Sequence, residues 1–197
     1  MAKNVGSQYG LDQTGYEVPM MDDQEMPDDK TLASTGKRDL VFTRVFDAPV
    51  ERVWKAWTDP EQVKRWWGPG GFSCPFARID LREGGISLIC MRAPKEFMGG
   101  QDMYSTWTYT KIVPLRELEY LHHFSDKDGN RVEPISQGLP PEMPEEVRNL
   151  VTFKAVGGDK TEVSVTEYGW PVGHMMEMSK MGMEQCLDKM AAIFAKP

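Results

Sequence analysis

Apolar residues in the first half of the chain follow two different periods. Residues 38–46 (RDLVFTRVF) alternate between apolar and polar side chains, which predicts a β-strand. Val50, Val53, Trp54 and Trp57 then recur at i, i+3, i+4 and i+7, the spacing of one helical face. We therefore expect a strand that leads directly into a short helix.

A second short helix is expected next. The stretch TDPE (58–61) offers a capping side chain, a proline for the first turn and an acid near the positive helix end. Val63, Trp66 and Trp67 would form the inner face of this helix, and Gly68 would end it.

From residue 72 onward the period changes to two, which predicts a series of strands. They are expected near 72–81, 84–92, 101–113, 117–125, 147–156 and 161–168. Between the fourth and fifth lies a proline-rich excursion, residues 126–146, of a length often found in functional loops. Apolar side chains then return at helical spacing from His174 to Phe194. The predicted fold class is α+β, an antiparallel sheet of six or seven strands covered by a long C-terminal helix at about 172–195.

Several motifs carry a family resemblance when they occur in this order. They are FDAP (46–49), VWKAWTDP (53–60), RWWGP (65–69), DLREGG (80–85), IVP (112–114) and GMEQCL (182–187). With them the chain resembles the helix-grip fold of the SRPBCC superfamily. Within it, the chain is similar to bacterial proteins related to the C-terminal domain of the activator of the heat-shock-protein-ninety ATPase.

The resemblance implies a curved sheet that grips the C-terminal helix and leaves a cavity between them. It also implies that the two short helices plug one end of the sheet, with Trp66 and Trp67 as packing bulk; contact of a tryptophan with a ligand is the alternative. Two positions depart from the relatives, which often carry tryptophan where this chain has Ile86-Ser87 and Met183. Both changes remove rigid bulk.

Charge divides the chain into two predicted parts. Residues 1–36 hold seven acidic residues and two lysines, so they carry five of the seven net negative charges. We expect this segment to be an acidic, flexible arm and residues 37–197 to form the helix-grip domain. The nearly neutral domain does not favour nucleic acid as a partner.

Location and metal binding are also constrained by the sequence. No apolar run approaches the ~20 residues that span a bilayer, so no membrane partner is expected. Three widely spaced cysteines indicate a reduced, cytoplasmic protein without a metal site.

Strand phase predicts which side chains line the cavity, because alternate residues of a strand share a face. The predicted set is aromatic and methionine-rich, a composition typical of a pocket for a small hydrophobic or aromatic molecule. It comprises Ile89, Met91, Trp107, Tyr109, Tyr120, His122, Phe153, Met178, Met183 and Cys186. A cavity of roughly 300 Å³ or more is expected for a small organic ligand. The alternative is that these side chains simply fill the core.

Catalytic signals are weak. His122 is the only credible general acid or base, since the adjacent His123 must face the other side of its strand. No HExxH, GxSxG or phosphate-binding loop is present, and no cofactor is predicted.

Three functions therefore stay open. The leading hypothesis is non-catalytic binding of a small hydrophobic ligand. The alternatives are an enzyme of cyclase, hydrolase or dehydratase type in the same cavity, and a co-chaperone-like ATPase activator or stress-response interaction module. A homodimer and a protein partner are also possible from the sequence.

Overall fold

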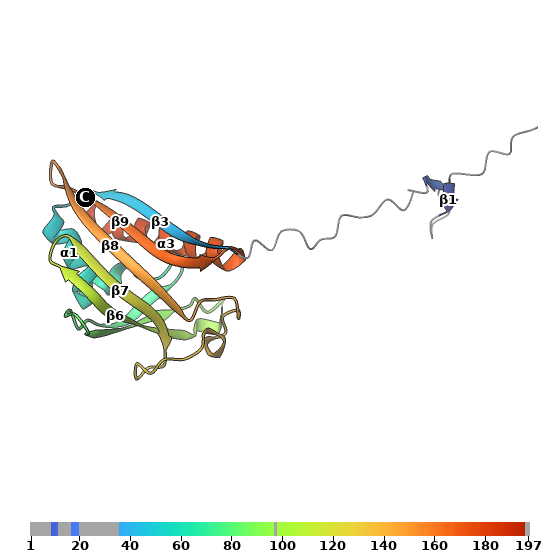
Figure 1. Cartoon of the computed structure of the whole chain (residues 1–197), viewed down its shortest axis with the longest axis horizontal. Coiled ribbons are helices and arrows are strands. Elements are labelled where there is room, and N and C mark those ends of the chain that lie inside the picture. The colour runs from blue at the N-terminus through green and yellow to red at the C-terminus, as the bar shows by residue number, and fades with distance from the viewer. Residues whose placement is uncertain (1–8, 12–16, 20–35, 97, 196–197) are drawn as a thin grey trace, which may run out of the picture. The chain divides into compact units, whose positions relative to one another are not determined.

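The computed structural model of the chain describes residues 9–11, 17–19, 36–96 and 98–195 (Figure 1). It divides into two units, Met1–Ser34 and Thr35–Pro197. In the first unit, β1 (Tyr9–Leu11) and β2 (Glu17–Pro19) pair as a two-stranded antiparallel sheet. The predicted flexibility of the acidic arm concerns residues that lie mostly outside those described, and it stays a prediction.

The second unit is built on one antiparallel sheet of seven strands in the order β3-β9-β8-β7-β6-β5-β4. The strands are β3 (Lys37–Phe46), β4 (Ser73–Arg78), β5 (Ile86–Arg92), β6 (Asp102–Val113), β7 (Glu117–Ser125), β8 (Glu146–Gly157) and β9 (Lys160–Pro171). The predicted α+β helix-grip fold is confirmed. The strand expected at 72–81 ends at Arg78, and the last strand continues beyond the expected residue 168 to Pro171.

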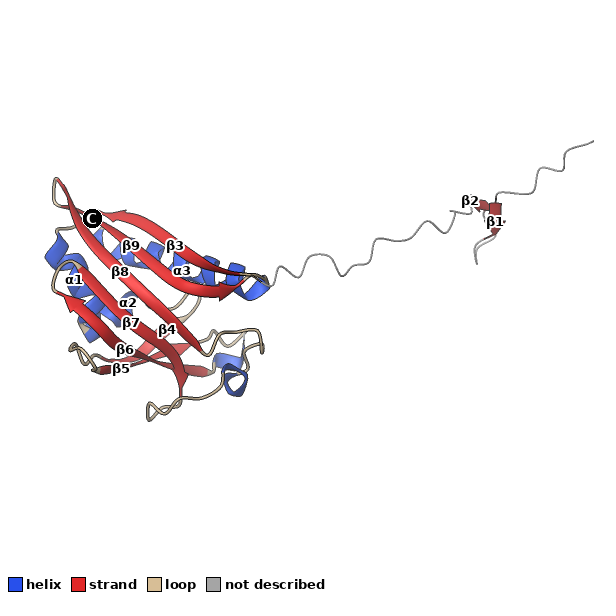
Figure 2. Ribbon diagram, in the orientation of Figure 1, coloured by secondary structure: helices blue, strands red, loops and turns tan. Residues whose placement is uncertain are grey.

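The sheet curves around the C-terminal helix α3 (His174–Phe194), which lies within its concave side (Figure 2). Register shifts interrupt the pairing in β3, β6 and β8. Such bulges increase local twist and bend a strand. Met176, Met183, Leu187, Met190 and Phe194 bury the inner face of α3, and the long C-terminal helix that the sequence predicts is confirmed.

Two short helices, α1 (Val50–Thr58) and α2 (Pro60–Trp66), fill one end of the curved sheet. Asp59 caps α2, since its carboxylate accepts hydrogen bonds from the backbone N–H groups of Glu61 and Gln62. Trp66 is fully buried and its indole N–H donates to the carbonyl of Ala56 at 2.8 Å. This tryptophan therefore joins the two helices into one plug.

Trp67 departs from the expectation that it continues the inner face of α2. The helix ends at Trp66, and Trp67 is the C-cap residue with an extended backbone (φ −65°, ψ 133°). Its ring still meets that of Trp66 edge to face, with centroids 5.4 Å apart. Trp67 packs on Trp107 with ring centroids 4.8 Å apart.

The glycine turn after Trp67 is fastened to α3. Gly68 has φ +101°, a conformation that L side chains rarely adopt. The ammonium of Lys189 donates to the carbonyls of Gly68 at 2.8 Å and Phe72 at 3.1 Å, and Gln185 accepts from the N–H of Gly70 at 2.7 Å. The turn thus links the plug to the C-terminal helix.

Candidate ligand cavity

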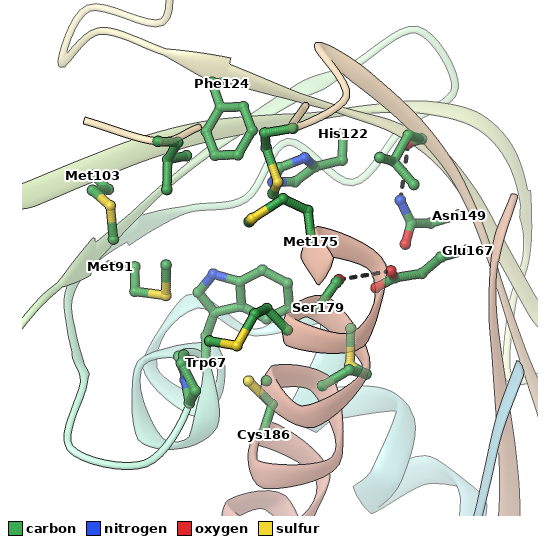
Figure 3. A pocket seen from close by; sticks show the side chains of 18 of the residues that line it. Trp67, Met91, Met103, His122, Phe124, Asn149, Glu167, Met175, Ser179 and Cys186 are labelled. Atoms are coloured by element: carbon green, nitrogen blue, oxygen red, sulfur yellow. Dashed lines mark hydrogen bonds between the residues drawn. The ribbon is translucent and has the colours of Figure 1, made fainter. Parts of the chain in front are cut away.

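A cavity of about 230 Å³ lies between the inner face of the sheet and the N-terminal half of α3 (Figure 3). Its walls come from β5 to β9, α3, the glycine turn and the excursion at 126–146. The volume is smaller than the 300 Å³ expected from the sequence. It still exceeds the ~150 Å³ apolar cavity that can accept benzene, so a one-ring organic molecule fits.

Methionine dominates the apolar wall. Six methionines line the cavity: Met91, Met103, Met143, Met175, Met178 and Met183. Met183 is buried, whereas Met178 is 41% exposed and lies at the rim. Unbranched thioether side chains adapt to irregular shapes, so this wall can adjust to a ligand.

The proline-rich excursion forms part of the wall through Leu139 and Met143. A short 3-10 turn, Pro134–Gln137, anchors it. The side-chain amide of Gln137 donates to the carbonyls of Tyr104 at 3.0 Å and Ser125 at 2.6 Å. The excursion is therefore fixed to the ends of β6 and β7 while it covers the cavity.

Glu167 is a buried carboxyl group in the cavity wall. The hydroxyl of Ser179 donates to its Oε2 at 3.2 Å (Figure 3). The indole N–H of Trp170 donates to the same oxygen at 2.8 Å. Burial raises the pKa of Glu167 to about 7, and the two hydrogen bonds only partly oppose this. A group with this pKa exchanges a proton near neutral pH.

His122 and Asn149 add two further polar groups to the wall. His122 keeps some accessible surface, but Figure 3 shows that its ring faces the cavity. Enclosure there lowers the pKa of His122 to about 4, and the neighbouring His123 adds to the effect. His122 is therefore neutral at pH 7. Asn149 is buried and its amide donates to the carbonyl of Val147 at 2.9 Å.

Six of the ten sequence-predicted residues line this cavity, and four do not. Those that line it are Met91, Tyr120, His122, Met178, Met183 and Cys186. Ile89, Trp107, Tyr109 and Phe153 are buried outside its wall.

The four excluded residues pack in the core instead, some of them against the plug. Phe153 meets Trp54 and Trp57 edge to face, and Trp107 stacks on Tyr120 with centroids 4.9 Å apart. The hydroxyl of Tyr109 accepts from Ser87 at 3.3 Å. The strand faces were assigned correctly, but the plug occupies one half of the sheet and leaves only the other half open.

The sequence reasoning missed the residues that give the cavity its polarity, although strand phase contained the signal. Glu167 is two residues beyond the inward-facing Val165, and Asn149 is two residues before Val151. Ser179 is one helical turn from Met183 on the same face of α3. Trp67 was assigned to packing, and it both packs and lines the cavity.

The cysteines carry no activated thiol. All three are free and buried. Burial raises the pKa of Cys74 to about 12 and those of Cys90 and Cys186 to about 11, so each is a neutral thiol at pH 7. Within the described residues, no group of three His, Cys, Asp or Glu side chains is placed to hold a metal ion.

A second cavity, of about 410 Å³, surrounds His123 and is of a different kind. It is lined mainly by charged side chains, including Arg131, Glu133, Glu145 and Glu146. Glu146 pairs with the imidazole Nε2 of His123 at 2.6 Å. This site lacks the apolar walls of a small-molecule pocket, so the methionine-lined cavity is the better candidate.

None of the described helices is long and apolar enough to cross a membrane.

Comparison with known proteins identifies both a family and a fold. The family model described as Activator of Hsp90 ATPase homolog 1-like protein matches residues 47–195. No curated protein matches the chain.

Solved structures of similar shape come from several bacteria. A protein from Chromobacterium violaceum is 25% identical, with a TM-score of 0.64 over 81% of this chain and 98% of that one. A protein from Arthrobacter aurescens is also 25% identical, with a TM-score of 0.65 over 81% and 87%. The AHSA1 protein from Silicibacter pomeroyi is 19% identical, with a TM-score of 0.60 over 79% and 96%.

Proposed function

Because the chain belongs to the Activator of Hsp90 ATPase homolog 1-like family, whose fold is typical of proteins that bind hydrophobic ligands, we propose that it binds a small, largely apolar molecule. The binding site is the cavity between the sheet and α3. The observation that carries the proposal is a partly open cavity of about 230 Å³ with a methionine-rich wall and a few polar groups. A pocket of this composition gains affinity from apolar burial and orientation from the polar groups.

A cavity-filling variant tests the proposal. Met183 is buried against the cavity, so Met183→Trp adds bulk where the space is open. Met181 lies two residues away on the exposed face of α3, at 48% exposure, and Met181→Trp adds the same bulk outside the cavity. The probe is benzyl alcohol, a neutral one-ring compound, titrated by calorimetry into the full-length chain and both variants.

The expected result is that Met183→Trp weakens benzyl alcohol binding at least tenfold, whereas Met181→Trp leaves it within about twofold of the parent protein. Filling existing space is also expected to change stability little, in contrast to the ~1–3 kcal/mol lost when a filled core is overpacked. Strong destabilisation by Met183→Trp together with undiminished probe binding would show that the ligand site lies elsewhere.

Acid–base catalysis in the same cavity is a second candidate, carried by Glu167. A carboxyl group with a pKa of about 7 is suited to proton transfer at neutral pH, whereas His122, with a pKa of about 4, is a poor base there. This reassigns the catalytic candidate from His122 to Glu167. The two functions are separated by extracting the molecule that co-purifies with the protein from its own host and incubating it with fresh protein. Mass spectrometry should then find the molecule chemically changed by an enzyme and intact after exposure to a binder.

Two further predictions from the sequence have no specific support among the described surfaces. The co-chaperone-like function rests on the family description alone, and the homodimer stays a prediction. Size-exclusion chromatography with light scattering would measure the oligomeric state directly.

A further inference from the structure

The polar end of the cavity contains an incompletely paired carboxyl group. Both hydrogen bonds to Glu167 from described residues go to Oε2, from Trp170 and from Ser179. The other oxygen, Oε1, accepts none of the described hydrogen bonds. Figure 3 shows the carboxyl group of Glu167 beside Ser179 at the wall of the cavity. Since Glu167 lines the cavity, a bound molecule can reach this oxygen.

Among the described residues, no positively charged side chain is paired with this carboxyl group. The twenty residues that line the cavity include neither lysine nor arginine. The side chains around Glu167 come from each packed element: Leu40 from β3 and Asn149 from β8 are its strand neighbours, and Tyr120 from β7 and Cys186 from α3 lie within electrostatic range.

The titratable groups near Glu167 are themselves neutral at pH 7. Burial raises the pKa of Cys186 to about 11 and that of Tyr120 well above its ordinary value. His122, also in the wall, is neutral because its pKa is lowered. A buried carboxyl group without a partner keeps its proton, and only a countercharge stabilises its ionised form. No described residue of the wall supplies that countercharge, so a cationic ligand is the group that would hold Glu167 ionised.

Aromatic rings supply a second element of cation recognition. Trp67, Tyr120, Phe124 and Trp170 all line the cavity. The face of an aromatic ring attracts a cation, most strongly for tryptophan and more so when both are removed from water. A carboxylate with one free oxygen among aromatic and thioether side chains favours an organic ammonium group over a neutral or anionic head.

We propose that the ligand of this cavity is a small organic amine, with its protonated nitrogen at Glu167 Oε1 and its apolar body among the methionines. The proposal rests on the function proposed above and specifies the chemical class of the ligand. Trp170 and Ser179 act as positioning residues, because their hydrogen bonds to Oε2 hold the carboxyl group with Oε1 free.

The proposal has a defined pH dependence. An ammonium ligand pairs only with ionised Glu167. Because the pKa of Glu167 is about 7, amine affinity should rise up to tenfold per pH unit below pH 7 and level off above it. A neutral ligand should show no such trend. A carboxylate ligand should show the reverse trend, since it meets like charge above pH 7.

Three probes with the same ring distinguish these cases: benzylamine, benzyl alcohol and benzoate. Each is titrated by calorimetry into the full-length chain at pH 6, 7 and 8. We expect benzylamine to bind at least tenfold more tightly than benzyl alcohol at pH 8, and this ratio to fall as the pH is lowered to 6. Benzoate should bind most weakly at pH 8.

Two variants connect the preference to the carboxyl group. Glu167→Gln should bring benzylamine to within about threefold of benzyl alcohol at every pH. Glu162→Gln, on the same strand but outside the cavity wall, should keep the full preference. The pH profile of the parent protein tests the proposal independently if Glu167→Gln does not fold.

Failure of this inference and failure of the proposed function give different results. If benzyl alcohol binds in the Met183-dependent manner described above but benzylamine shows no preference, or keeps it in Glu167→Gln, the amine assignment is overturned and the ligand-binding function stands. Benzoate binding that strengthens as the pH falls, without an amine preference, would instead identify protonated Glu167 as a hydrogen-bond donor. If none of the three probes binds, the proposed function itself fails.

Discussion

Replacement of Glu167 by glutamine should make the protein more stable at neutral pH. Burial raises the pKa of Glu167 from its ordinary value of 4.5 to about 7 in the folded state. Between these two values the unfolded chain has lost the proton while the folded chain still holds it. Stability therefore decreases as the pH rises through this window, and the loss is complete above about pH 7.

The magnitude follows from the size of the shift. Each pKa unit corresponds to about 1.4 kcal/mol, so the rise from 4.5 to about 7 makes the ionised group at pH 8 cost about 3 kcal/mol of folding free energy. Glutamine is isosteric and does not ionise, and its carbonyl oxygen can still accept from Trp170 and Ser179. The stability difference between Glu167→Gln and the parent should therefore grow from near zero at pH 4.5 to about 3 kcal/mol at pH 8.

The quantity to compare is the difference in unfolding free energy between Glu167→Gln and the parent, because His122 changes the stability of both proteins with pH in the opposite direction. Its folded pKa is lowered from 6.5 to about 4, so the unfolded chain binds the extra proton between these values and stability rises with pH across that window. In the parent protein the two contributions oppose each other where their pH windows overlap. Subtracting the parent curve from the variant curve removes the contribution of His122.

Urea unfolding followed by tryptophan fluorescence, at half-unit steps from pH 4.5 to 8.5, gives the required curves. Glu162→Gln is the matched control, since Glu162 lies on the same strand about a third exposed and contacts Lys154 only at 3.9 Å. Its replacement should change stability by no more than ~0.5 kcal/mol throughout. A Glu167→Gln difference that is the same at pH 5 and pH 8 would refute the assignment of a raised pKa to Glu167.

Three other predictions concern the plug, the helix and the arm. Trp66→Ala should lower the free energy of unfolding, measured in urea, by ~3–5 kcal/mol, because it empties a fully buried site. Trp67→Ala should cost clearly less stability and should change the affinity for benzyl alcohol. Equal destabilisation by the two variants with unchanged binding would contradict a packing role for Trp66 and a cavity role for Trp67. Gly182→Ala should raise the free energy of unfolding by up to ~1 kcal/mol, because alanine favours the helix and a Cβ at this position would meet only Pro69, at 3.9 Å. A destabilised variant would indicate that the contact between α3 and the glycine turn is crowded. Deletion of residues 1–36 should lower the thermal midpoint by less than about 4 °C, equivalent to about 1 kcal/mol, and a larger fall would show that the arm packs on the domain.

The fold was predictable because each element has its own local signal. The alternation in β3, the helical spacing of Val53 and Trp57, and the amphipathic run of α3 all specify structure without reference to distant residues. Strand phase also predicted which sheet face is covered, and the placement of Tyr120 and His122 follows from it.

The location of the open space along that face was not predictable from the same signals. Trp107 and Tyr120 share the inner face and stack on one another, yet only Tyr120 lines the cavity. The difference depends on how far the plug reaches across the sheet, which is set by tertiary packing rather than by periodicity. Glu167 was overlooked for a related reason, because a charged residue in phase with Val163 and Val165 is more easily interpreted as the solvent-facing end of a strand.

The boundary between the packed and open halves of the sheet is set by the end of one helix. Had α2 continued by one residue, Trp67 would follow Trp66 around the helix and pack with it in the plug. Because the helix ends at Trp66, the extended backbone of Trp67 directs its ring onto Trp107 on one side and toward the cavity on the other. The glycine turn that follows permits this early ending, since Gly68 adopts φ +101° and Lys189 holds its carbonyl. The motif RWWGP therefore joins two roles in adjacent residues, since Trp66 is buried in the core and Trp67 forms part of the cavity wall.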